Sequence, residues 1–435
     1  MRPFRNAGVL FIGRGVQGVL SVVYLALAAR GLGVEAFGTL ILIHSLVLST
    51  AQLCRFQTWQ AIMKYGADAQ QREDQCFFRR LIVFSLRLDF FSATVACGIL
   101  IAGMPSFLSL FELPVDMLGV LRSYAILVLF MVAGSGPLGV LRLFDRHDLI
   151  AWQTVIEPSI RLLGVVLLFA FDASLLAYLV VWFAATVASE IATWVMALGV
   201  LKVRRLIPRR EDLCITRFDL PPGIWRFVLG TNLNSTLNLG NTQLGILLCG
   251  WLLGASGAGY YRIAKQFADV LVKSSSKLLV PAIYTDMAEL TARDDHRTRR
   301  QVVRRSVLVA GAAAVAVFAV LTVSGRFLIS LTVGEAYLPA YVPMLWLALA
   351  GVIAILSFPF EPLLVSAGRI RATVITRLAA IVIYFAAFYT LGTRFELLGA
   401  ALAATVNAAV TTLLFYYYGS SLLRKQHAGS GTSAG

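Results

Sequence analysis

The sequence predicts an all-α polytopic membrane protein with about twelve transmembrane helices, arranged as two six-helix lobes around a central cavity, with both termini cytoplasmic. Of its 435 residues, 58% are hydrophobic and 14% are charged, whereas a soluble chain carries about a quarter charged residues. The apolar residues form blocks of about 18 to 25, long enough to cross about 30 Å of hydrocarbon. Basic residues concentrate in alternate loops, which sets the expected orientation.

Each apolar block is expected to be a helix, because backbone inside hydrocarbon has to satisfy its own hydrogen bonds. The predicted helices of the first half span residues 6–29, 37–62, 79–103, 119–141, 150–171 and 174–200. Those of the second half span residues 223–253, 257–284, 303–332, 339–365, 370–392 and 395–419.

The longest basic loop lies at the midpoint of the chain and contains three prolines. It predicts an N-terminal lobe, a cytoplasmic connector, a C-terminal lobe and a disordered cytoplasmic tail, over residues 1–200, 201–222, 223–419 and 420–435. The net charge of +15 is explained by these cytoplasmic loops, so no nucleic-acid partner is expected.

Short repeated motifs relate the two halves. Leu32-Gly33 followed by Gly38 returns as Leu253-Gly254 followed by Gly259. Repeats that run in the same direction, each with an even number of helices, predict lobes related by an axis along the membrane normal, with a cavity between them.

Charged residues inside predicted helices are the strongest functional signal, because a charge at the bilayer centre costs about 2.5–3.5 kcal/mol. Arg14 lies about 12 Å into the first helix between two glycines. In the eighth helix a charged stripe recurs every three or four residues and so occupies one face. The stripe consists of Arg262, Lys265, Asp269, Lys273 and Lys277. It predicts a cationic cavity wall, with an ion-paired packing ladder as the alternative.

Further polar residues complete the candidate site. Arg55, near the end of the second helix, is either a second-site cation or a side chain that reaches the interface. The seventh helix carries amides that could contact sugar hydroxyls or bind neighbouring helices, namely Asn232, Asn234, Asn238, Asn241 and Gln243. Four carboxylates within apolar blocks are candidates for ion coupling, namely Glu190, Asp269, Glu157 and Asp89. Glu157 has Arg161 one turn later, which favours a local salt bridge.

Several classes of protein are disfavoured by what the sequence lacks. It contains no phosphate-binding GxxxxGKS, no HExxH and no histidine-rich metal spacing. The outer loops are too short to hold a catalytic domain. We therefore expect neither an enzyme nor a bound cofactor or metal. The five cysteines are scattered without ligand spacing, so reduced thiols are expected.

Motifs concentrated in the first 150 residues resemble a known family. They include Gly13-Arg14-Gly15, the run Ala29-Arg30-Gly31-Leu32-Gly33, and Trp59-Gln60-Ala61-Ile62. Pro137-Leu138-Gly139 and Arg146-His147-Asp148-Leu149 extend the likeness. In this order the motifs resemble the polysaccharide exporters and O-antigen flippases of the multidrug/oligosaccharidyl-lipid/polysaccharide superfamily.

The resemblance implies a flippase that carries undecaprenyl-pyrophosphate oligosaccharide from the cytoplasmic to the periplasmic leaflet of the bacterial inner membrane, for O-antigen (lipopolysaccharide), capsule or exopolysaccharide. Implied partners are this lipid-linked oligosaccharide, membrane lipids, and glycan polymerase, chain-length or export proteins. Related peptidoglycan-precursor flippases carry arginines on their first, second and eighth helices, in places similar to Arg14, Arg55 and Arg262. Those relatives have two extra helices that form a lipid groove, which this chain lacks, so the path of the prenyl tail is open.

Three alternatives stay open at the level of sequence. A cation-coupled multidrug exporter of the same superfamily would need an acidic cavity, whereas this chain has Arg14 in its first helix. A membrane-embedded glycan polymerase or ligase would need a large outer loop. A scaffold for glycan assembly that transports nothing is distinguished only by a transport assay.

Overall fold

The structure, a computed structural model, describes the backbone of residues 2–213, 221, 223–239, 243–292, 296–357, 360, 364 and 370–430. Side chains are described for residues 13, 15–212, 221, 223–232, 236, 243–269, 307–357, 360, 364 and 371–421. The described residues form helices and turns and contain no strand. The chain divides into two compact units, unit 1 (Met1–Leu247) and unit 2 (Leu248–Gly435), and each is considered by itself.

Unit 1 is built from one long kinked helix and a set of shorter ones. Its elements are α1 (Arg2–Cys54), α2 (Thr58–Gln71), α3 (Gln75–Leu110), η1 (Val115–Met117), α4 (Leu118–Ala125), α5 (Leu127–Ala133), α6 (Ser135–Leu143), α7 (His147–Ala170), α8 (Leu175–Val203), η2 (Arg210–Leu213) and α9 (Ile224–Leu239). The first residues of α10 (Leu244–Ala292) also belong to it.

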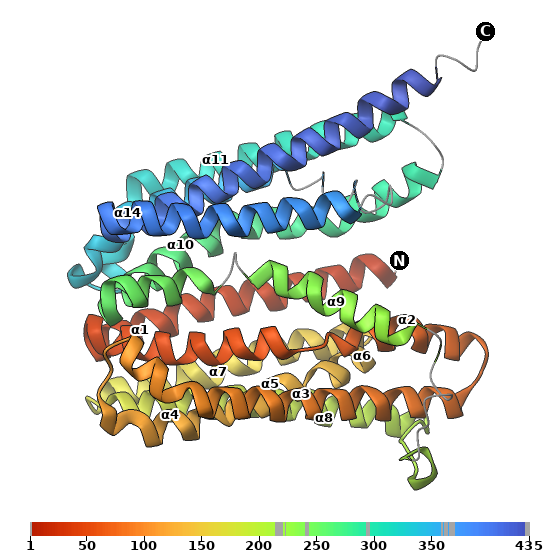
Figure 1. Cartoon of the computed structure of the whole chain (residues 1–435), viewed down its shortest axis with the longest axis horizontal. Coiled ribbons are helices and arrows are strands. Elements are labelled where there is room, and N and C mark those ends of the chain that lie inside the picture. Colours follow the sequence, from red (N-terminus) through yellow and green to blue (C-terminus); the bar gives the residue numbers. More distant parts are fainter. Residues whose placement is uncertain are drawn as a thin grey trace. The chain divides into compact units, whose positions relative to one another are not determined.

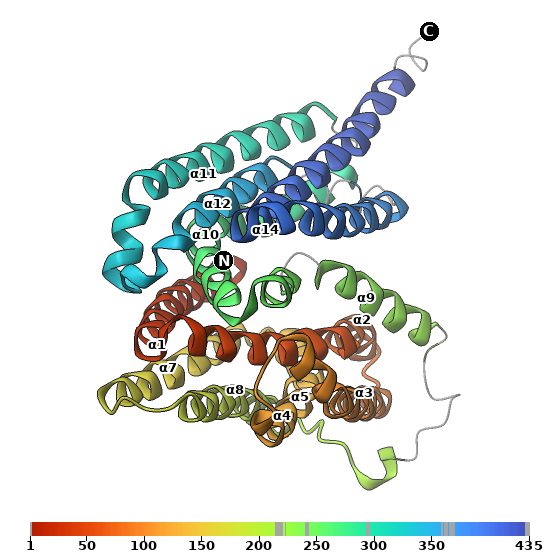
Figure 2. The same ribbon diagram turned by 60° about the vertical axis from the view of Figure 1, so that its left-hand side comes forward.

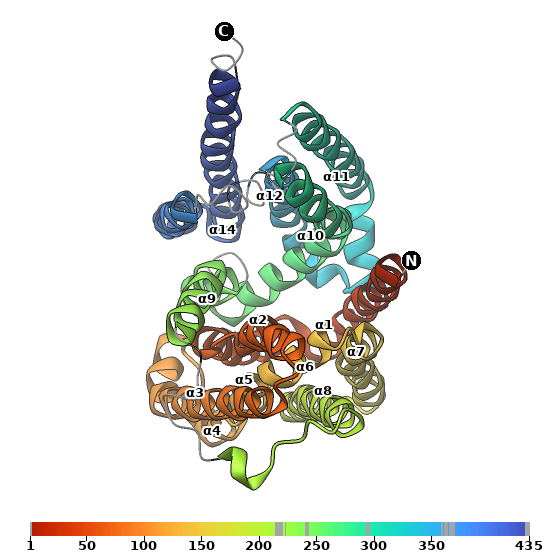
Figure 3. The same cartoon turned by 90° about the vertical axis from the view of Figure 1, so that its right-hand side faces the viewer.

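The helices of unit 1 pack as a bundle around α5 and α6. Helix α5 contacts α1, α3 and α8, and α6 contacts α2, α7 and α8. Figure 3 looks nearly along these helices and shows α5 and α6 between α3 on one side and α7 and α8 on the other. Helix α9 packs on α1 and α2. Polar residues on α5 and α6 are therefore enclosed by neighbouring helices.

In each unit a long helix is divided by a glycine whose backbone conformation other residues rarely adopt. Gly33 divides α1 into two segments with φ 73° and ψ 176°, and Gly254 divides α10 with φ 70° and ψ −171°. A Cβ atom is strongly disfavoured at these angles. The repeated Leu-Gly motif of the sequence therefore corresponds to the same backbone turn in both units.

The structure corrects the bounds of three predicted helices. The predicted helix 37–62 ends at Cys54, and three residues separate it from α2. The predicted helix 119–141 is divided into α4, α5 and α6 by single turn residues. The predicted helix 223–253 stops at Leu239 and resumes at Leu244. Interrupted helices are tolerated in a membrane where neighbouring groups satisfy the freed backbone atoms, and such contacts are present after Cys54, as shown below.

Unit 2 consists of the rest of α10 with α11 (His296–Thr332), η4 (Glu335–Ala340), α12 (Tyr341–Ser357) and α14 (Ile370–Ser430), which bends at Glu396. Helix α12 contacts both α11 and α14 and lies between them in Figure 2. Helix α14 extends to Ser430, beyond the predicted end at residue 419. The last five residues of the predicted tail lie outside the described residues.

Nine candidate membrane spans occur among the described residues. Two of them, Gly15–Gln71 and Arg371–Ser421, have 57 and 51 residues, more than twice the roughly 20 residues that one crossing needs. Helix α1 is divided at Gly33 and helix α14 at Glu396, and both long helices can be followed in Figure 1. The predicted all-α polytopic class is confirmed, with nine or more apolar helices in the part of the chain that is described.

Two predictions about organisation have different outcomes. The predicted limits of the two lobes stay a prediction. The sequence placed α9 in the second lobe, whereas in the structure α9 packs on α1 and α2 and belongs to unit 1. The four cysteines that the structure describes, Cys54, Cys76, Cys97 and Cys249, are free, as expected for reduced packing residues.

Candidate functional site

Charged and hydroxyl side chains gather in the interior of unit 1, around Arg161 of α7. Its guanidinium is buried, with 6% of the residue exposed. It forms an ion pair with Glu157 one turn earlier, as the sequence predicted. Thr186 of α8 accepts a hydrogen bond from Arg161 at 3.1 Å and donates one to Glu157 at 2.9 Å. The ion pair is therefore enclosed by a hydroxyl from the neighbouring helix, which lowers the cost of burying it.

The same guanidinium contacts aromatic side chains of α1 and α8. Arg161 donates a hydrogen bond to the Tyr24 hydroxyl at 3.1 Å, and it lies 5.2 Å from the centre of the Trp182 ring. His44 Nε2 lies 3.1 Å from Arg161 Nη2, and His44 Nδ1 lies 2.9 Å from the Tyr124 hydroxyl. An arginine can only donate, so Nε2 of His44 accepts and Nδ1 carries the proton toward Tyr124. We call these residues, with Glu157 and Thr186, the Arg161 cluster.

A second buried carboxylate, Asp89 of α3, joins three elements of unit 1. No part of this residue is exposed. Thr58 at the start of α2 lies 2.9 and 2.8 Å from its two oxygens, and the backbone N–H of Gly136 donates to Oδ2 at 2.9 Å. A side chain at Gly136 would press on the carboxylate, because an added Cβ would lie 3.3 Å from Oδ2. Asp89 thus fixes α2 and α6 against α3.

Arg55 occupies the break between α1 and α2. One of its Nη atoms donates to the Met131 carbonyl, and its own carbonyl accepts a hydrogen bond from the Asn232 amide at 2.9 Å. These contacts satisfy backbone groups that the break sets free. Arg55 also interacts electrostatically with Asp89 and with Glu190. The two roles considered for Arg55 from the sequence both stay predictions, and its described contacts are with the backbone around the break.

Glu190 lies on α8, directly against α6. An added Cβ at Gly134 would lie 1.9 Å from Glu190 Oε2, so only glycine leaves room for this carboxylate. Glu190 interacts electrostatically with Glu157 as well as with Arg55. Three of the predicted coupling carboxylates, Asp89, Glu157 and Glu190, therefore lie on helices of unit 1.

In unit 2, the described part of the predicted charged stripe lies on α10. Arg262, Lys265 and Asp269 are half-buried, and Lys265 Nζ is 3.6 Å from Asp269 Oδ2. The predicted neutralisation of Lys265 by Asp269 is present. The side chains of Lys273 and Lys277 lie outside the described residues.

The other predicted contacts are only partly described. Arg14, Asn234, Asn238 and Asn241 also have side chains outside the described residues. Of the predicted amides, Asn232 binds the backbone at Arg55, and Gln243 precedes α10 with a buried side-chain oxygen that has no hydrogen-bond partner among the described residues. No group of His, Cys, Asp and Glu fit to hold a metal ion occurs among the residues searched.

Sequence reasoning missed the neutral members of these clusters: Tyr24, His44, Thr58, Tyr124, Trp182 and Thr186. A signal existed for His44, since it is the only one of the four histidines within a predicted helix. The others are common residue types in membrane helices, and only packing brings them to a charge.

The comparisons with known proteins agree on the fold and on the membrane. A solved inward-facing multidrug resistance MATE family transporter of the MOP superfamily matches with a TM-score of 0.78 and 12% identity, over 95% of this chain and 96% of that one. A MOP superfamily transporter from Pyrococcus furiosus, described as having a binding pocket of reverse polarity, matches with a TM-score of 0.68 and 13% identity, over 98% and 96% of the two chains. These similarities show a MATE-like transporter fold with two lobes.

Sequence comparison is more specific. The inner membrane protein YghQ of Escherichia coli strain K12 is 30% identical over 339 residues, which cover 78% of this chain and 94% of YghQ. The sequence profile of the family described as "Polysaccharide biosynthesis protein" matches residues 27–342. The resemblance inferred from the motifs is thereby confirmed at family level, and a multi-pass location in the bacterial inner membrane follows. The chain belongs to this polysaccharide biosynthesis protein family, on the transporter fold of the MOP superfamily.

Proposed function

We propose that the protein is a flippase that moves undecaprenyl-pyrophosphate-linked oligosaccharide from the cytoplasmic to the periplasmic leaflet by alternating access. The observation that carries the proposal is the combination of a polysaccharide biosynthesis family match with a transporter fold. A saccharide assembled on a polyprenyl carrier has a polar head group that cannot cross hydrocarbon unaided. Transport of this head group makes and breaks no bond, and the product would enter O-antigen, capsule or exopolysaccharide synthesis.

The charge inside the helices supports an anionic substrate. Arg262 and Lys265 place two cations one turn apart on α10, and only one carboxylate, Asp269, accompanies them on the described part of that face. Arg14 and Lys273 extend the proposal to residues outside the described side chains. A pyrophosphate would be held by such cations through charge-assisted hydrogen bonds, and the amides at Asn232, Asn234, Asn238, Asn241 and Gln243 would contact sugar hydroxyls.

For coupling to an ion gradient, we propose Glu190 ahead of the other carboxylates. Asp89 is held by Thr58 and Gly136, and Glu157 is held by Arg161 and Thr186. Both therefore have packing roles that account for them. Glu190 lies on α8 against Gly134 of α6, and Arg55 and Glu157 are the charged groups that influence it.

The deciding experiment is a leaflet-accessibility assay in proteoliposomes with a labelled polyprenyl-pyrophosphate oligosaccharide. It compares the native chain with Arg14→Gln, Arg262→Gln and the control Arg210→Gln, whose arginine is exposed in η2 outside any candidate span. Movement of the label by the native chain and the control, with loss in the first two folded variants, supports the flippase. No movement by the native chain argues against it.

A cation-coupled multidrug exporter is the second candidate, favoured by the MATE family transporters among the structural neighbours. Their low identity makes this a similarity of fold alone. Export of a cationic dye under a proton gradient by the same proteoliposomes, without movement of the labelled oligosaccharide, would replace the flippase by this function.

A further inference from the structure

Unit 1 contains a groove that the proposed transport function does not use. It has a volume of about 410 Å³ and lies between the start of α7 and the end of α8. Leu149 of α7 faces Met196, Gly199, Val200 and Val203 of α8 across it. Ligand pockets commonly enclose about 300–1,000 Å³ and are mostly apolar, so the groove is large enough for part of an acyl chain.

The groove lies at the boundary between hydrocarbon and water. Arg146 and Phe144 fall between the candidate spans that end at Leu143 and begin at His147, and Arg204 directly follows the span that ends at Val203. The adjoining surface of α7 and α8 is apolar and exposed, with Trp152 69% and Val203 83% accessible. An exposed tryptophan next to a span end is typical of the interfacial zone. The apolar part of the groove therefore opens toward lipid.

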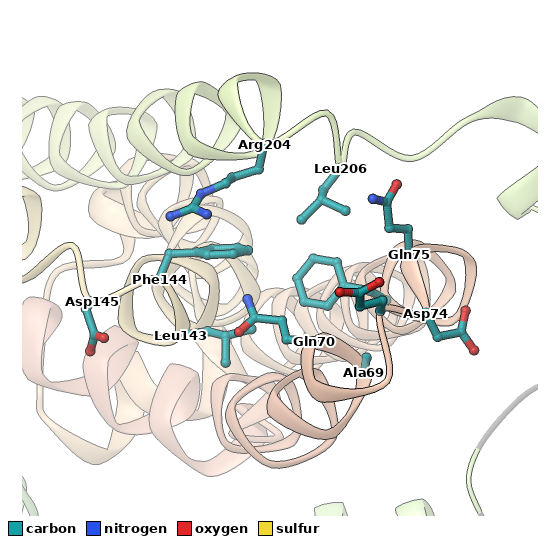
Figure 4. Close-up of a pocket in the computed structure, with 11 residues that line it drawn as sticks. Ala69, Gln70, Asp74, Gln75, Leu143, Phe144, Asp145, Arg204 and Leu206 are labelled. Atoms are coloured by element: carbon teal, nitrogen blue, oxygen red, sulfur yellow. The ribbon is translucent and has the colours of Figure 1, made fainter.

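The polar end of the groove is basic. Arg204 reaches over the Phe144 ring, with 5.3 Å between the guanidinium carbon and the ring centre (Figure 4). Arg146 is oriented by Asp148, to which it donates two hydrogen bonds of 2.9 and 2.8 Å. Two of the five N–H donors of Arg146 are used in this way, so donors are left for a further anion.

The end of α8 also begins a basic run, consisting of Lys202, Arg204, Arg205, Arg209 and Arg210. Four or more basic residues directly beside a membrane helix are typical of sites for anionic lipid head groups. The positive charge near the groove is therefore larger than the two lining arginines alone.

A neighbouring cavity has more acidic than basic lining residues, and this contrast helps to define the ligand of the groove. Phe144 and Arg204 also line this second cavity, of about 660 Å³. Figure 4 shows the carboxylates of Asp74 and Asp145 at its edge. Anions are disfavoured there. On the α7 side of Phe144, Arg146 and Arg204 are the charged lining residues, and a negative head group on an apolar tail matches that arrangement.

We propose that the groove between α7 and α8 binds an anionic phospholipid of the surrounding membrane. One acyl chain lies along Gly199, Val200 and Val203, and the phosphate contacts Arg146 and Arg204. Gly199 provides the space, because an added Cβ at this position would meet no atom within 4 Å. The inference does not depend on the transported substrate.

Native mass spectrometry of the full chain in an uncharged detergent tests the site. Phosphatidylglycerol and phosphatidylcholine with identical acyl chains are titrated separately. Each basic residue near an anionic lipid head group contributes about 1 kcal/mol of binding free energy. We therefore expect phosphatidylglycerol to bind about tenfold more tightly than phosphatidylcholine, and Arg204→Gln or Arg146→Gln to weaken phosphatidylglycerol binding about fivefold. Arg210→Gln, which lies outside the groove lining, should change the affinity less.

A second pair of variants tests the apolar part. Gly199→Leu should fill the groove and weaken both lipids. Gly98→Leu on α3, where an added Cβ also meets no atom within 4 Å, is the control and should weaken neither. Equal thermal unfolding of the two variants shows that both are folded.

Four results would overturn the proposal. They are equal affinity for the two lipids, equal effects of Gly199→Leu and Gly98→Leu, displacement of the lipid by soluble glycerol phosphate, and loss of a dimer in Gly199→Leu. The third would indicate a site for the phosphate alone, and the fourth an interface between two copies of the chain. Binding of a polyprenyl phosphate with no binding of phosphatidylglycerol would likewise replace the phospholipid by the carrier lipid.

Discussion

The helical segments that follow Gly33 in unit 1 and Gly254 in unit 2 begin with the same backbone turn but use their polar residues differently. Eleven residues after each glycine stands a side chain that can carry positive charge, His44 in unit 1 and Lys265 in unit 2. His44 is 7% exposed and contacts Arg161 and Tyr124, which are 117 and 80 residues away in sequence. Lys265 pairs with Asp269, one turn later in its own helix.

This difference separates two uses of charge in a membrane helix. In unit 1 the polar groups connect helices, so each side chain is held by several others and its loss affects the fold. In unit 2 the ion pair of Lys265 with Asp269 lies within one helix. A charge inside an apolar helix requires a partner, water or a ligand, and variants at the two sites distinguish these uses.

The largest expected effect is that of Arg161→Gln. The variant loses the ion pair with Glu157 together with the contacts of Arg161 to Tyr24, His44 and Thr186 on other helices, so we expect the free energy of unfolding to fall by about 3 kcal/mol. Thermal unfolding in detergent, followed by tryptophan fluorescence, measures the change. The matched variant Lys265→Gln in unit 2 should shift the unfolding temperature far less. Equal shifts would show that the two units do not differ in this way.

The next effect tests what the units share. Gly33→Ala and Gly254→Ala should each lower the free energy of unfolding by about 1–3 kcal/mol, because an alanine at these angles is strained. Neither added Cβ would meet an atom within 4 Å, so the cost is one of backbone conformation alone. Gly98→Ala, within helical backbone, is the control and should stabilise by about 0.5–1 kcal/mol. A penalty at only one of the two glycines would contradict a shared turn.

The sequence was sufficient for features that depend on local spacing. Apolar blocks gave the membrane class, and the separation of four residues between Glu157 and Arg161 predicted their ion pair, which is present. The repeated Leu-Gly motif marked both sharp turns, because few residues other than glycine accept a positive φ. The match of the family profile confirms the resemblance found in the motifs.

Features that depend on packing between helices could not be predicted. The break at residues 55–57 lies inside the predicted helix 37–62, and the groups that satisfy it come from Asn232 and Met131, far along the chain. The burial of Asp89 was predicted, but its partners Thr58 and Gly136 were not, since they are 31 and 47 residues away. Hydropathy contains no information about such distant partners. The assignments of Arg14, Arg55, Arg262, Lys265, Lys273 and the five amides to a substrate site all stay predictions.

A smaller effect is expected for Thr58→Val, which removes one hydroxyl from the Asp89 site. A hydrogen bond to a charged group contributes about 1.5–3 kcal/mol, and the Gly136 N–H continues to bind the carboxylate, so we expect the lower end of that range. Thr94→Val on α3 is the matched control, since its hydroxyl is exposed and bonds only within its helix among the described residues. Similar shifts in unfolding temperature for the two variants would show that the hydrogen bonds of Thr58 to Asp89 do not stabilise the packing of α2 against α3.

The smallest effect on stability, and the sharpest test of the comparison, belongs to Lys265. The ion pair of Lys265 with Asp269 is long, at 3.6 Å, and joins residues four apart in one helix, so its loss in Lys265→Gln should cost about 0–1 kcal/mol. If the charge serves an anionic substrate, the same variant should reduce translocation of the labelled lipid-linked oligosaccharide at least severalfold, and Lys265→Arg should restore it. A loss of transport that arginine does not restore would mean that the shape of the lysine, and not its charge, is required. Full transport by Lys265→Gln would remove this residue from the substrate path.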